Sequence, residues 1–593
     1  MSSVVKVKPI IEVARGLGLS EEELIPYGRL KAKVALGATQ RPARGRLVLV
    51  SALTPTDAGE GKTMTSISLA QGLAHLGESA CLALREPSLG PVFGQKGGAT
   101  GGGRASLVPS QDINLHFTGD FHAISAANNL LAALLDNHLH QGNRLGLDPR
   151  RILWRRVLDL NDRALRHVIV GLGGPAEGVP RESGFDITPA SEIMAILCLA
   201  RDVADLRARL SRILVGLTYD KKPVTAADLK AVGSLMALLK EALLPNLVQT
   251  VEGVPAFVHG GPFANIAHGC NSVLATRAAL AHADWAVTEA GFGFDLGGEK
   301  FFDIKCRSAE LSPAAVVLVA TAKALKRHGG VTKDALGQGN PDAVERGLGN
   351  LEKHIENARA FGRTPIIAIN RFPTDTADEL AVISRACERQ KVPWALLEGF
   401  ARGGEGGADL AALVREHADK VAPPVRTLYD LHESVKTKME KIAKTMYGAR
   451  AVRFSREAEQ DLEQARALGA EALPLCVAKT QMSLSDDPKR VGRPEGFDVM
   501  VRRLVLSAGA GFLVPLLGDI IRMPGLPATP QADKIDLVDG EIVLKEGAPV
   551  HLDPAAAMER VAEAQARMLR DSVKIDYANR PGDQISPLSL PMA

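Results

Sequence analysis

A glycine-containing segment, TPTDAGEGKT at residues 54–63, stands between an apolar run and a helical pattern. This order restricts the chain to folds in which a helix begins directly beyond the carboxyl end of a strand. Backbone N–H groups of such a loop surround phosphate oxygens, and the helix N-terminus adds a favourable potential. Lys62 would reach the β- and γ-phosphates of a nucleotide, and the Thr63 hydroxyl would hold Mg²⁺.

The segment departs from the standard phosphate-loop pattern at Thr56, where that pattern has glycine. A glycine turn with an exposed lysine is the alternative interpretation, but the flanking strand and helix favour nucleotide binding. We therefore predict that ATP and Mg²⁺ bind here. The predicted nucleotide-binding residues are Thr54, Pro55, Thr56, Asp57, Ala58, Gly59, Glu60, Gly61, Lys62 and Thr63.

Short β-rich runs alternate with longer helical stretches, which predicts a parallel sheet covered by helices. Ligands of open α/β folds bind at the carboxyl edge of such a sheet, so functional loops are expected there. The predicted strands cover residues 46–53, 80–86, 167–174, 255–261, 285–292 and 315–321, and the clearest helices cover residues 64–77 and 191–213.

The chain of 593 residues is too long for a single hydrophobic core, so several domains are expected. A polar, glycine-rich stretch near His328 indicates the first boundary. We predict an α/β fold with a P-loop NTPase-like parallel-sheet domain at residues 1–330 and two smaller α/β domains at 331–472 and 473–538. Residues 539–593 form a C-terminal extension of unknown role, starting in a short hairpin and continuing into an amphipathic helix.

Composition argues against several classes of partner. The formal net charge is only +3 and aromatic residues make up 4%, which favours neither nucleic acid nor an anionic membrane. The most apolar window, residues 504–517, is interrupted by Ser507 and Pro515 and falls short of a membrane span. Six scattered cysteines without a CxxC pair are typical of reduced thiols, so we expect a cytoplasmic location.

A long glycine-rich segment, residues 85–105, directly follows the second predicted strand, and DINLHFTGDFHAISAANN follows at residues 112–129. Such a stretch has few side chains to pack and many exposed amides, which favours function over structure. Arg85 stands at the strand end, where its planar guanidinium suits a carboxylate or phosphate group.

Together with other segments along the chain, these motifs resemble the formate–tetrahydrofolate ligase family. The resemblance extends in order from about residue 9 to residue 536. It rests on TPTDAGEGKT, REPSLGPVFG, DINLHFTGDFHAI, NDRALR, GFDITPASEIMAILCLA, LPNLVQT, PAFVHGGPFANIAHGCNS, TEAGFG, EKFFDIKCR, NRFPTDT, GGEGG, CVAKTQMSLSDDP, GRPEGF, SAGAGF and MPGLP.

The resemblance implies an activity. ATP would phosphorylate formate, and N10 of tetrahydrofolate would attack the resulting formyl phosphate to give 10-formyltetrahydrofolate, ADP and phosphate. It further implies Mg²⁺ with the ATP, a monovalent cation (K⁺ or NH₄⁺), tetrahydrofolate that can be polyglutamylated, and assembly as a homotetramer.

The resemblance also implies roles for individual residues. Lys62, Arg85 and Asp120 would be catalytic, with Arg85 neutralising formyl phosphate. The implied folate-binding residues are Glu86, Phe292, Phe372 and Phe400, and Glu86 would also lie near the monovalent cation.

Two departures from the family pattern stand out. Phe400 replaces a tryptophan that usually stacks on the pterin, which leaves a smaller π-face without an indole N–H. Asp57 stands where the family loop more often has a small residue or proline, and the backbone cradle does not need that side chain. Two alternatives stay open: a phosphate-loop enzyme that activates another carboxylate, and a non-catalytic relative that binds folate or nucleotide.

Other polar residues have two interpretations each. His259 and His268 line the active site by resemblance, but packed and satisfied histidines explain them nearly as well. Glu289, at a predicted strand end, is either a pocket residue or a turn carboxylate.

Overall fold

The computed structural model of the protein describes residues 7–56, 59–96, 98–538 and 541–544. Met1–Pro527 belong to one compact unit, and Ala528 begins a second, smaller unit. Asp57 and Ala58 of the predicted nucleotide loop lie outside the described residues, as does most of the predicted C-terminal extension.

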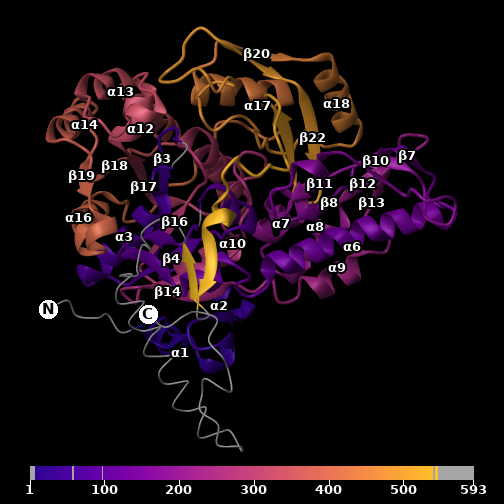
Figure 1. The fold of residues 1–593 in the computed structure, drawn as a ribbon, viewed down its shortest axis with the longest axis horizontal. Helices are drawn as coiled ribbons and strands as arrows, with labels where there is room; N and C mark the ends of the chain where they lie inside the picture. Colours follow the sequence, from indigo (N-terminus) through magenta and orange to yellow (C-terminus); the bar gives the residue numbers. More distant parts are fainter. Residues whose placement is uncertain (1–6, 57–58, 97, 539–540, 545–593) are drawn as a thin grey trace, which may run out of the picture. The chain divides into compact units, whose positions relative to one another are not determined.

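A large, mainly parallel sheet runs through the first unit (Figure 1). Its parallel part has seven neighbouring strands, in the order β15-β4-β16-β3-β17-β18-β19. β14 continues the sheet antiparallel to β15, followed by β2 and β1, and the β5–β6 hairpin joins through β14. The strands are β1 Leu24–Pro26, β2 Ala32–Val34, β3 Arg46–Ala52, β4 Ala80–Leu84, β5 Gly101–Gly102, β6 Ala105–Val108, β14 Asn246–Thr250, β15 Pro255–Val258, β16 Trp285–Glu289, β17 Pro313–Ala320, β18 Ile366–Asn370 and β19 Trp394–Leu397.

The central strands are buried on both faces, which explains their nearly continuous apolar runs. Successive side chains of a strand point to opposite faces, and along β3 Leu47 and Leu49 join one core while Val48 and Val50 join another. The helices that share the core of Val48 include α3 Lys62–His75 and α16 Ala408–His417, and those that share the core of Leu47 include α10 Val273–His282 and α13 Pro341–Ala360. The predicted mixed α/β architecture with a parallel sheet is confirmed, and its P-loop NTPase-like classification stays a prediction.

Between β6 and β14 the chain forms a region of helices and short strands, seen beside the sheet in Figure 1. Its hydrophobic core also takes in residues from later segments, among them Leu274, Cys476 and Phe512. α6 packs along α9 there, and β12 pairs with both β7 and β13. The elements are α6 Asp120–His140, β7 Leu147–Ile152, β8 Arg156–Leu158, β9 Val168–Val170, β10 Arg181–Ser183, β11 Phe185–Ile187, α7 Glu192–Leu199, α8 Val203–Ser211, β12 Leu214–Thr218, β13 Pro223–Thr225 and α9 Val232–Leu238.

The last part of the first unit contains two small sheets and two helices. The elements are α17 Val435–Ile442, β20 Ala451–Phe454, α18 Arg456–Ala467, β21 Asp498–Val501, β22 Arg503–Ser507 and β23 Phe512–Leu516. The apolar window at residues 504–517 is the β22–β23 hairpin. Within the described part of the chain, no helix has the length and apolar character needed to cross a membrane.

The remaining helices of the first unit are short or lie at its edges. They are α1 Ile10–Gly16, α2 Leu36–Thr39, α4 Leu89–Pro91, α5 Ser110–Asn114, α11 Arg307–Ala309, α12 Ala322–His328, α14 Ala377–Arg389 and α15 Gly399–Arg402. In the second unit, β24 Ile535–Val538 pairs antiparallel with β25 Glu541–Leu544, which confirms the predicted hairpin.

Two sequence-based predictions were wrong. The strand predicted at residues 167–174 is β9, which pairs only with β10 outside the central sheet, because the apolar run ends after three residues in a glycine turn. The helix predicted at residues 191–213 is two helices, α7 and α8. Ala200 has an extended backbone, and the Asp202 carboxylate caps α8 by accepting from the N–H of Asp205.

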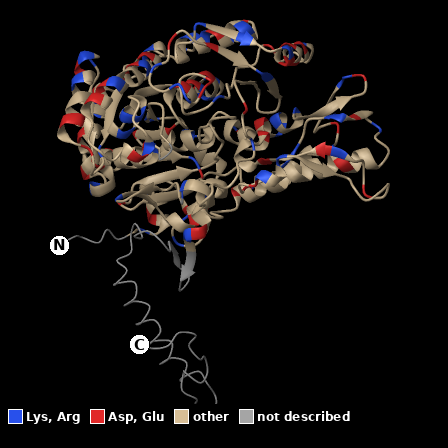
Figure 2. Ribbon diagram, turned by 45° about the horizontal axis from the view of Figure 1, so that its top comes forward, with Lys and Arg blue, Asp and Glu red and all other residues tan. Residues whose placement is uncertain are grey.

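The central sheet takes β17 from before residue 330 and β18 and β19 from after it. The predicted domain boundaries at residues 330, 472 and 538 stay predictions. Lys and Arg residues and Asp and Glu residues alternate along the ribbon in Figure 2.

Close packing of α13 on α12 generates a stability prediction. A Cβ on Gly347 would lie 2.0 Å from the carbonyl oxygen of Leu325, so Gly347→Ala requires a backbone shift. We expect a loss of about 1–3 kcal/mol, seen as a lower midpoint of thermal unfolding. Gly233→Ala in α9 is the matched control, since a Cβ there meets nothing within 4 Å, and this change is expected to be neutral or stabilising. Equal midpoints for the two variants would contradict the prediction.

Candidate active site

Loops that follow the parallel strands meet at one edge of the sheet, because these strands all end there. Most of the predicted site residues come from those loops, whereas Asp120 is the first residue of α6. Arg85 and Glu86 follow β4, the phosphate loop follows β3, Phe292 follows β16, Phe372 follows β18, and Phe400 lies in α15 after β19.

Two glycines shape the phosphate loop. Gly59 and Gly61 both have φ of +77°, a conformation that costs other residues energy. A Cβ on Gly61 would also lie 2.7 Å from Nδ2 of Asn370, and that amide donates to the carbonyl oxygen of Glu60 at 3.1 Å. The left-handed turn at Gly61 leads directly into α3, whose first residue is Lys62. The backbone N–H groups at the start of α3 therefore border the loop.

The carboxylate of Glu60 stabilises the phosphate loop by accepting hydrogen bonds from Thr56 within the loop. It is 2% exposed, and its Oε1 accepts from the backbone N–H of Thr56 at 2.8 Å and from the Thr56 hydroxyl at 3.0 Å. Its Oε2 accepts from the hydroxyl of Thr321, at the end of β17. Glu60 thus stabilises the loop conformation and ties it to the neighbouring strand.

A cluster of charged groups lies where α3 begins. The Thr63 hydroxyl donates to Oε2 of Glu289 at 2.8 Å, and Nη2 of Arg85 lies 3.5 Å from Oε1 of the same carboxylate. Glu289 is buried at the end of β16, whereas Arg85 is partly exposed. The structure therefore places the Glu289 carboxylate in contact with Thr63 and Arg85, the residues predicted for Mg²⁺ with ATP and for formyl phosphate.

Burial lowers the pKa of Lys62 to about 8. Glu289 acts in the opposite direction, and the charges of Arg85 and Lys96 lower this pKa further. An excess of positive charge therefore faces the phosphate loop, and a bound polyanion would relieve the repulsion among these cations.

Asp120 and Glu86 lie in a second, buried group of charges. Asp120 pairs through Oδ1 with Nζ of Lys33 at 2.7 Å and accepts at Oδ2 from Nδ2 of Asn246 at 2.7 Å. Glu86 is 5% exposed, and its pKa is raised well above the usual value by burial and by the charge of Asp120. Its Oε2 has no hydrogen-bond partner in the described part of the chain.

The three predicted aromatic residues of the folate pocket differ in how they are held. Phe292 has φ of +57°, a rare conformation for a bulky residue. The Lys323 ammonium lies 4.2 Å from the centroid of the Phe372 ring, which is a cation–π contact. Phe400 is 55% exposed. All three rings keep some exposed surface at the same edge of the sheet.

Phe400 rests on the glycine-rich segment that begins with Arg85. A Cβ on Gly102 would lie 3.2 Å from the Phe400 ring, and one on Gly103 would clash with the carbonyl oxygen of Phe400. That carbonyl accepts from the N–H of Arg104 at 2.9 Å. The absence of side chains at Gly102 and Gly103 therefore leaves room for the ring and the carbonyl group of Phe400.

The segment around Phe400 also packs against α3, the helix that begins at Lys62. The Ser68 hydroxyl donates to the carbonyl oxygen of Gly403 at 2.7 Å. A Cβ on Gly72 would lie 2.7 Å from the carbonyl oxygen of Gly407, so only glycine allows this approach. One helix thus connects the phosphate loop with the segment that carries Phe400.

The two histidines with open interpretations differ. His259 is satisfied, since Nδ1 contacts the Ser272 hydroxyl and Nε2 contacts the carbonyl oxygen of Ala242, each at 2.7 Å. His268 is fully buried, and neither ring nitrogen has a hydrogen-bond partner among the described residues. Burial holds the pKa of His268 well below its usual value.

A cavity of about 540 Å³ lies away from these residues, lined by Trp154, Glu192 and Arg522 among others from β8, α7, α18 and the β22–β23 hairpin. None of the predicted site residues lines it.

Sequence reasoning left Glu289 open and missed Asn370. Glu289 was visible as a carboxylate at a predicted strand end, but only strand order could show that β16 adjoins β3 and β4. Asn370 ends β18, far along the chain from the loop that it supports.

Comparison with known proteins gives two findings. The model of one protein family, Formate–tetrahydrofolate ligase, matches residues 1–544 of this chain. Among solved structures, a serine-to-alanine mutant of L. casei FPGS shares 11% identity over 78% of this chain and 81% of that one, with a TM-score of 0.18, a likeness too weak to support an argument.

The lowered pKa of Lys62 predicts how ATP affinity depends on pH. Lys62 loses its charge as pH rises through about 8, so ATP then binds only with uptake of a proton. We expect the association constant for ATP, measured by calorimetry at constant excess Mg²⁺, to fall about tenfold per pH unit above that value.

Lys62→Arg is the control, because a guanidinium stays charged over this range and should flatten the profile. Glu289→Gln removes the charge that raises the pKa of Lys62. In this variant the association constant for ATP should therefore begin to fall at a lower pH than in the wild type. An identical decline in the wild type and in Lys62→Arg would rule out Lys62 as the titrating group.

Proposed function

We propose a mechanism from the premise that this chain belongs to the formate–tetrahydrofolate ligase family, whose members are ATP-dependent ligases of one-carbon metabolism. In the proposed first step, a formate oxygen attacks the γ-phosphorus of ATP. The bond from that phosphorus to the β–γ bridging oxygen breaks, ADP leaves, and formyl phosphate forms. This step makes a poor electrophile into a mixed anhydride with phosphate as leaving group.

The observation that carries the proposal is the cluster of Lys62, Arg85, Thr63 and Glu289 at the start of α3. Lys62 would stabilise the negative charge on the transferred phosphoryl group. Arg85 would hold formate and then formyl phosphate, since its guanidinium matches both carboxylate and phosphate.

The donor atoms beside the loop also fit Mg²⁺. The Thr63 hydroxyl and the Glu289 carboxylate, 2.8 Å apart, are the hard oxygen ligands that this ion prefers. Bound with ATP, Mg²⁺ would supply neutralisation of phosphate charge. In that state Thr63 and Glu289 would both turn from their mutual hydrogen bond toward the ion.

In the proposed second step, N10 of tetrahydrofolate attacks the formyl carbon. The bond from that carbon to the phosphate oxygen breaks, the proton of N10 passes to the departing phosphate, and phosphate leaves beside Arg85. Asp120 would contribute by fixing the buried charges around Glu86, because both of its oxygens are already engaged by Lys33 and Asn246. The Glu86 oxygen without a partner in the described residues fits a monovalent cation or a polar group of folate.

Phe292, Phe372 and Phe400 would enclose the pterin, since each offers a partly exposed π-face at the same edge. A homotetrameric assembly and polyglutamylated folate stay predictions from the resemblance, and the cytoplasmic location stays a prediction from the cysteine pattern and composition.

The proposed function predicts a product that requires all three substrates. Purified protein with MgATP, formate and tetrahydrofolate in potassium buffer should give 10-formyltetrahydrofolate, which acid converts to methenyltetrahydrofolate with its own absorbance. Lys62→Ala should lower kcat/KM at least about 100-fold, the scale for loss of a charge that stabilises a transition state. Lys240→Ala, an exposed lysine after α9, is the matched control and should retain full activity. ATP-dependent turnover of another carboxylate without folate would overturn the proposal.

The position of Phe400 predicts a selective effect on folate. Phe400→Ala should raise KM for tetrahydrofolate about tenfold and leave KM for ATP unchanged, because a ring stack contributes about 1–3 kcal/mol. Phe400→Trp should lower KM for tetrahydrofolate, since its π-face is larger. Tyr219→Ala removes another exposed aromatic ring, on the β12–β13 turn, and should change neither constant. An equal rise for both alanine variants would argue against stacking.

A further inference from the structure

Thr54, the first residue of the phosphate loop, is held at every polar atom by residues far away in the sequence. Its N–H donates to Oδ1 of Asn350 at 3.2 Å, and its carbonyl oxygen contacts Nε2 of His328 at 2.9 Å. Its hydroxyl contacts Nε2 of His354 and Nδ2 of Asn350, each at 3.0 Å. Thr54 is fully buried, so the surrounding side chains replace water completely.

Two of these side chains also hold Gly492, which lies more than a hundred residues further along the chain. Nδ2 of Asn350 donates to the carbonyl oxygen of Gly492 at 2.9 Å, and the N–H of Gly492 donates to Nδ1 of His328 at 3.0 Å. Asn350 and His328 therefore bridge the backbone of Thr54 to the backbone of Gly492. We call these four residues the Thr54–Gly492 bridge.

The protonation state of His328 follows from this arrangement. Because Nδ1 accepts from Gly492, the ring proton lies on Nε2 and is donated to the carbonyl oxygen of Thr54. Burial lowers the pKa of His328 to about 4, so the ring is neutral around pH 7. A neutral ring with one donor and one acceptor matches the two backbone groups that it joins.

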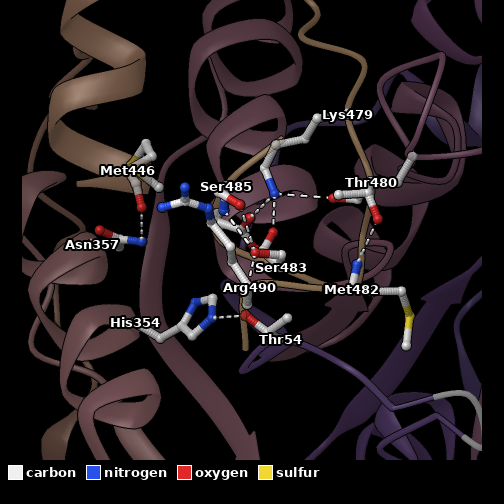
Figure 3. A network of polar contacts seen from close by, with 12 residues as sticks. Thr54, His354, Asn357, Met446, Lys479, Thr480, Met482, Ser483, Ser485 and Arg490 are labelled. Atoms are coloured by element: carbon white, nitrogen blue, oxygen red, sulfur yellow. Dashed lines mark hydrogen bonds and ion pairs between the residues drawn. The ribbon is translucent and has the colours of Figure 1, made fainter. Parts of the chain in front are cut away.

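Gly492 ends a segment that is fixed by its own polar contacts (Figure 3). Nζ of Lys479 pairs with Asp295 at 2.9 Å and donates to the carbonyl oxygens of Thr480 and Ser483. The Ser483 hydroxyl donates to the carbonyl oxygen of Arg490 at 2.5 Å. The segment of residues 479–492 is therefore cross-linked by its own polar contacts, and Gly492 connects it to Asn350 and His328.

We propose that Asn350 and His328 are positioning residues that couple the segment of residues 479–492 to the phosphate loop. This inference rests on the proposal that residues 54–63 bind ATP. Coupling is reciprocal, so ATP binding should stabilise the segment by the same free energy that the bridge contributes to ATP binding.

The first test compares two asparagines of α13. Asn350→Ala should raise KM for ATP about tenfold, the size expected when buried hydrogen bonds are lost, with KM for tetrahydrofolate unchanged. Asn357 is the matched control, because it is also fully buried on α13 and its Nδ2 donates to the carbonyl oxygen of Met446 at 2.9 Å, away from Thr54 (Figure 3). Asn357→Ala should lower thermal stability and leave KM for ATP unchanged.

The second test uses the other bridging side chain. His328→Ala should raise KM for ATP, and His328→Gln should recover part of the loss, since an amide also offers one donor and one acceptor. Equal KM values for ATP in Asn350→Ala and Asn357→Ala, or equal values in the two His328 variants, would overturn the inference.

The third test measures the coupling as the rate at which trypsin cleaves within residues 479–492. Lys489 and Arg490 are exposed, so trypsin can be used to cleave there. MgATP should slow this cleavage in the wild type. In Asn350→Ala the rate of cleavage should be the same with and without MgATP. Unchanged cleavage with MgATP in the wild type would overturn the inference. If Lys62→Ala leaves KM for ATP unaltered, the proposal that residues 54–63 bind ATP fails. If Lys62→Ala raises KM for ATP but Asn350→Ala does not raise it above the value of Asn357→Ala, ATP binding by residues 54–63 stands and the proposed coupling through Asn350 and His328 fails.

Discussion

Parallel hydrogen bonding from β15 to β19 is the constraint from which the site follows. Because the strands run in the same direction, the loops after β3, β4, β16, β18 and β19 all lie at one edge. Burial of both sheet faces by helices fixes the strands in this order. Residues spread over more than half of the chain can therefore act on one ligand without any of the strands moving.

Charge is distributed unevenly along that edge. Lys62 and Arg85 face the phosphate loop with Glu289 as their main counter-charge, so a polyanion improves the local balance. Next to them, Glu86 and Asp120 share the charge of Lys33, and the pKa of Glu86 is raised by its burial. Excess positive charge beside the phosphate loop therefore adjoins a buried carboxyl whose charged form is disfavoured.

Glycines and buried amides connect the parts of the site mechanically. The close approach at Gly72 ties α3 to the segment of Phe400, and the Thr54–Gly492 bridge ties the phosphate loop to the segment of residues 479–492. Both contacts join backbone that is distant in sequence. Such contacts fix the distance between two backbone segments, because hydrogen-bond lengths vary by only a few tenths of an ångström.

The sequence alone determined the strand, loop and helix around residues 46–75 and the alternation that makes a parallel sheet, since these are local patterns of apolar spacing and glycine. The family followed from the resemblance of its motifs, and the family model over residues 1–544 confirms it. The sequence also predicted Lys62, Thr63 and Arg85, which the structure brings to one cluster through Glu289. Only tertiary structure decided that Glu289 contacts Thr63 and Arg85, that both oxygens of Asp120 are engaged, and that β9 lies outside the central sheet. The physical reason is that strand order and buried hydrogen bonds join residues far apart in the chain, and no local pattern records such pairs.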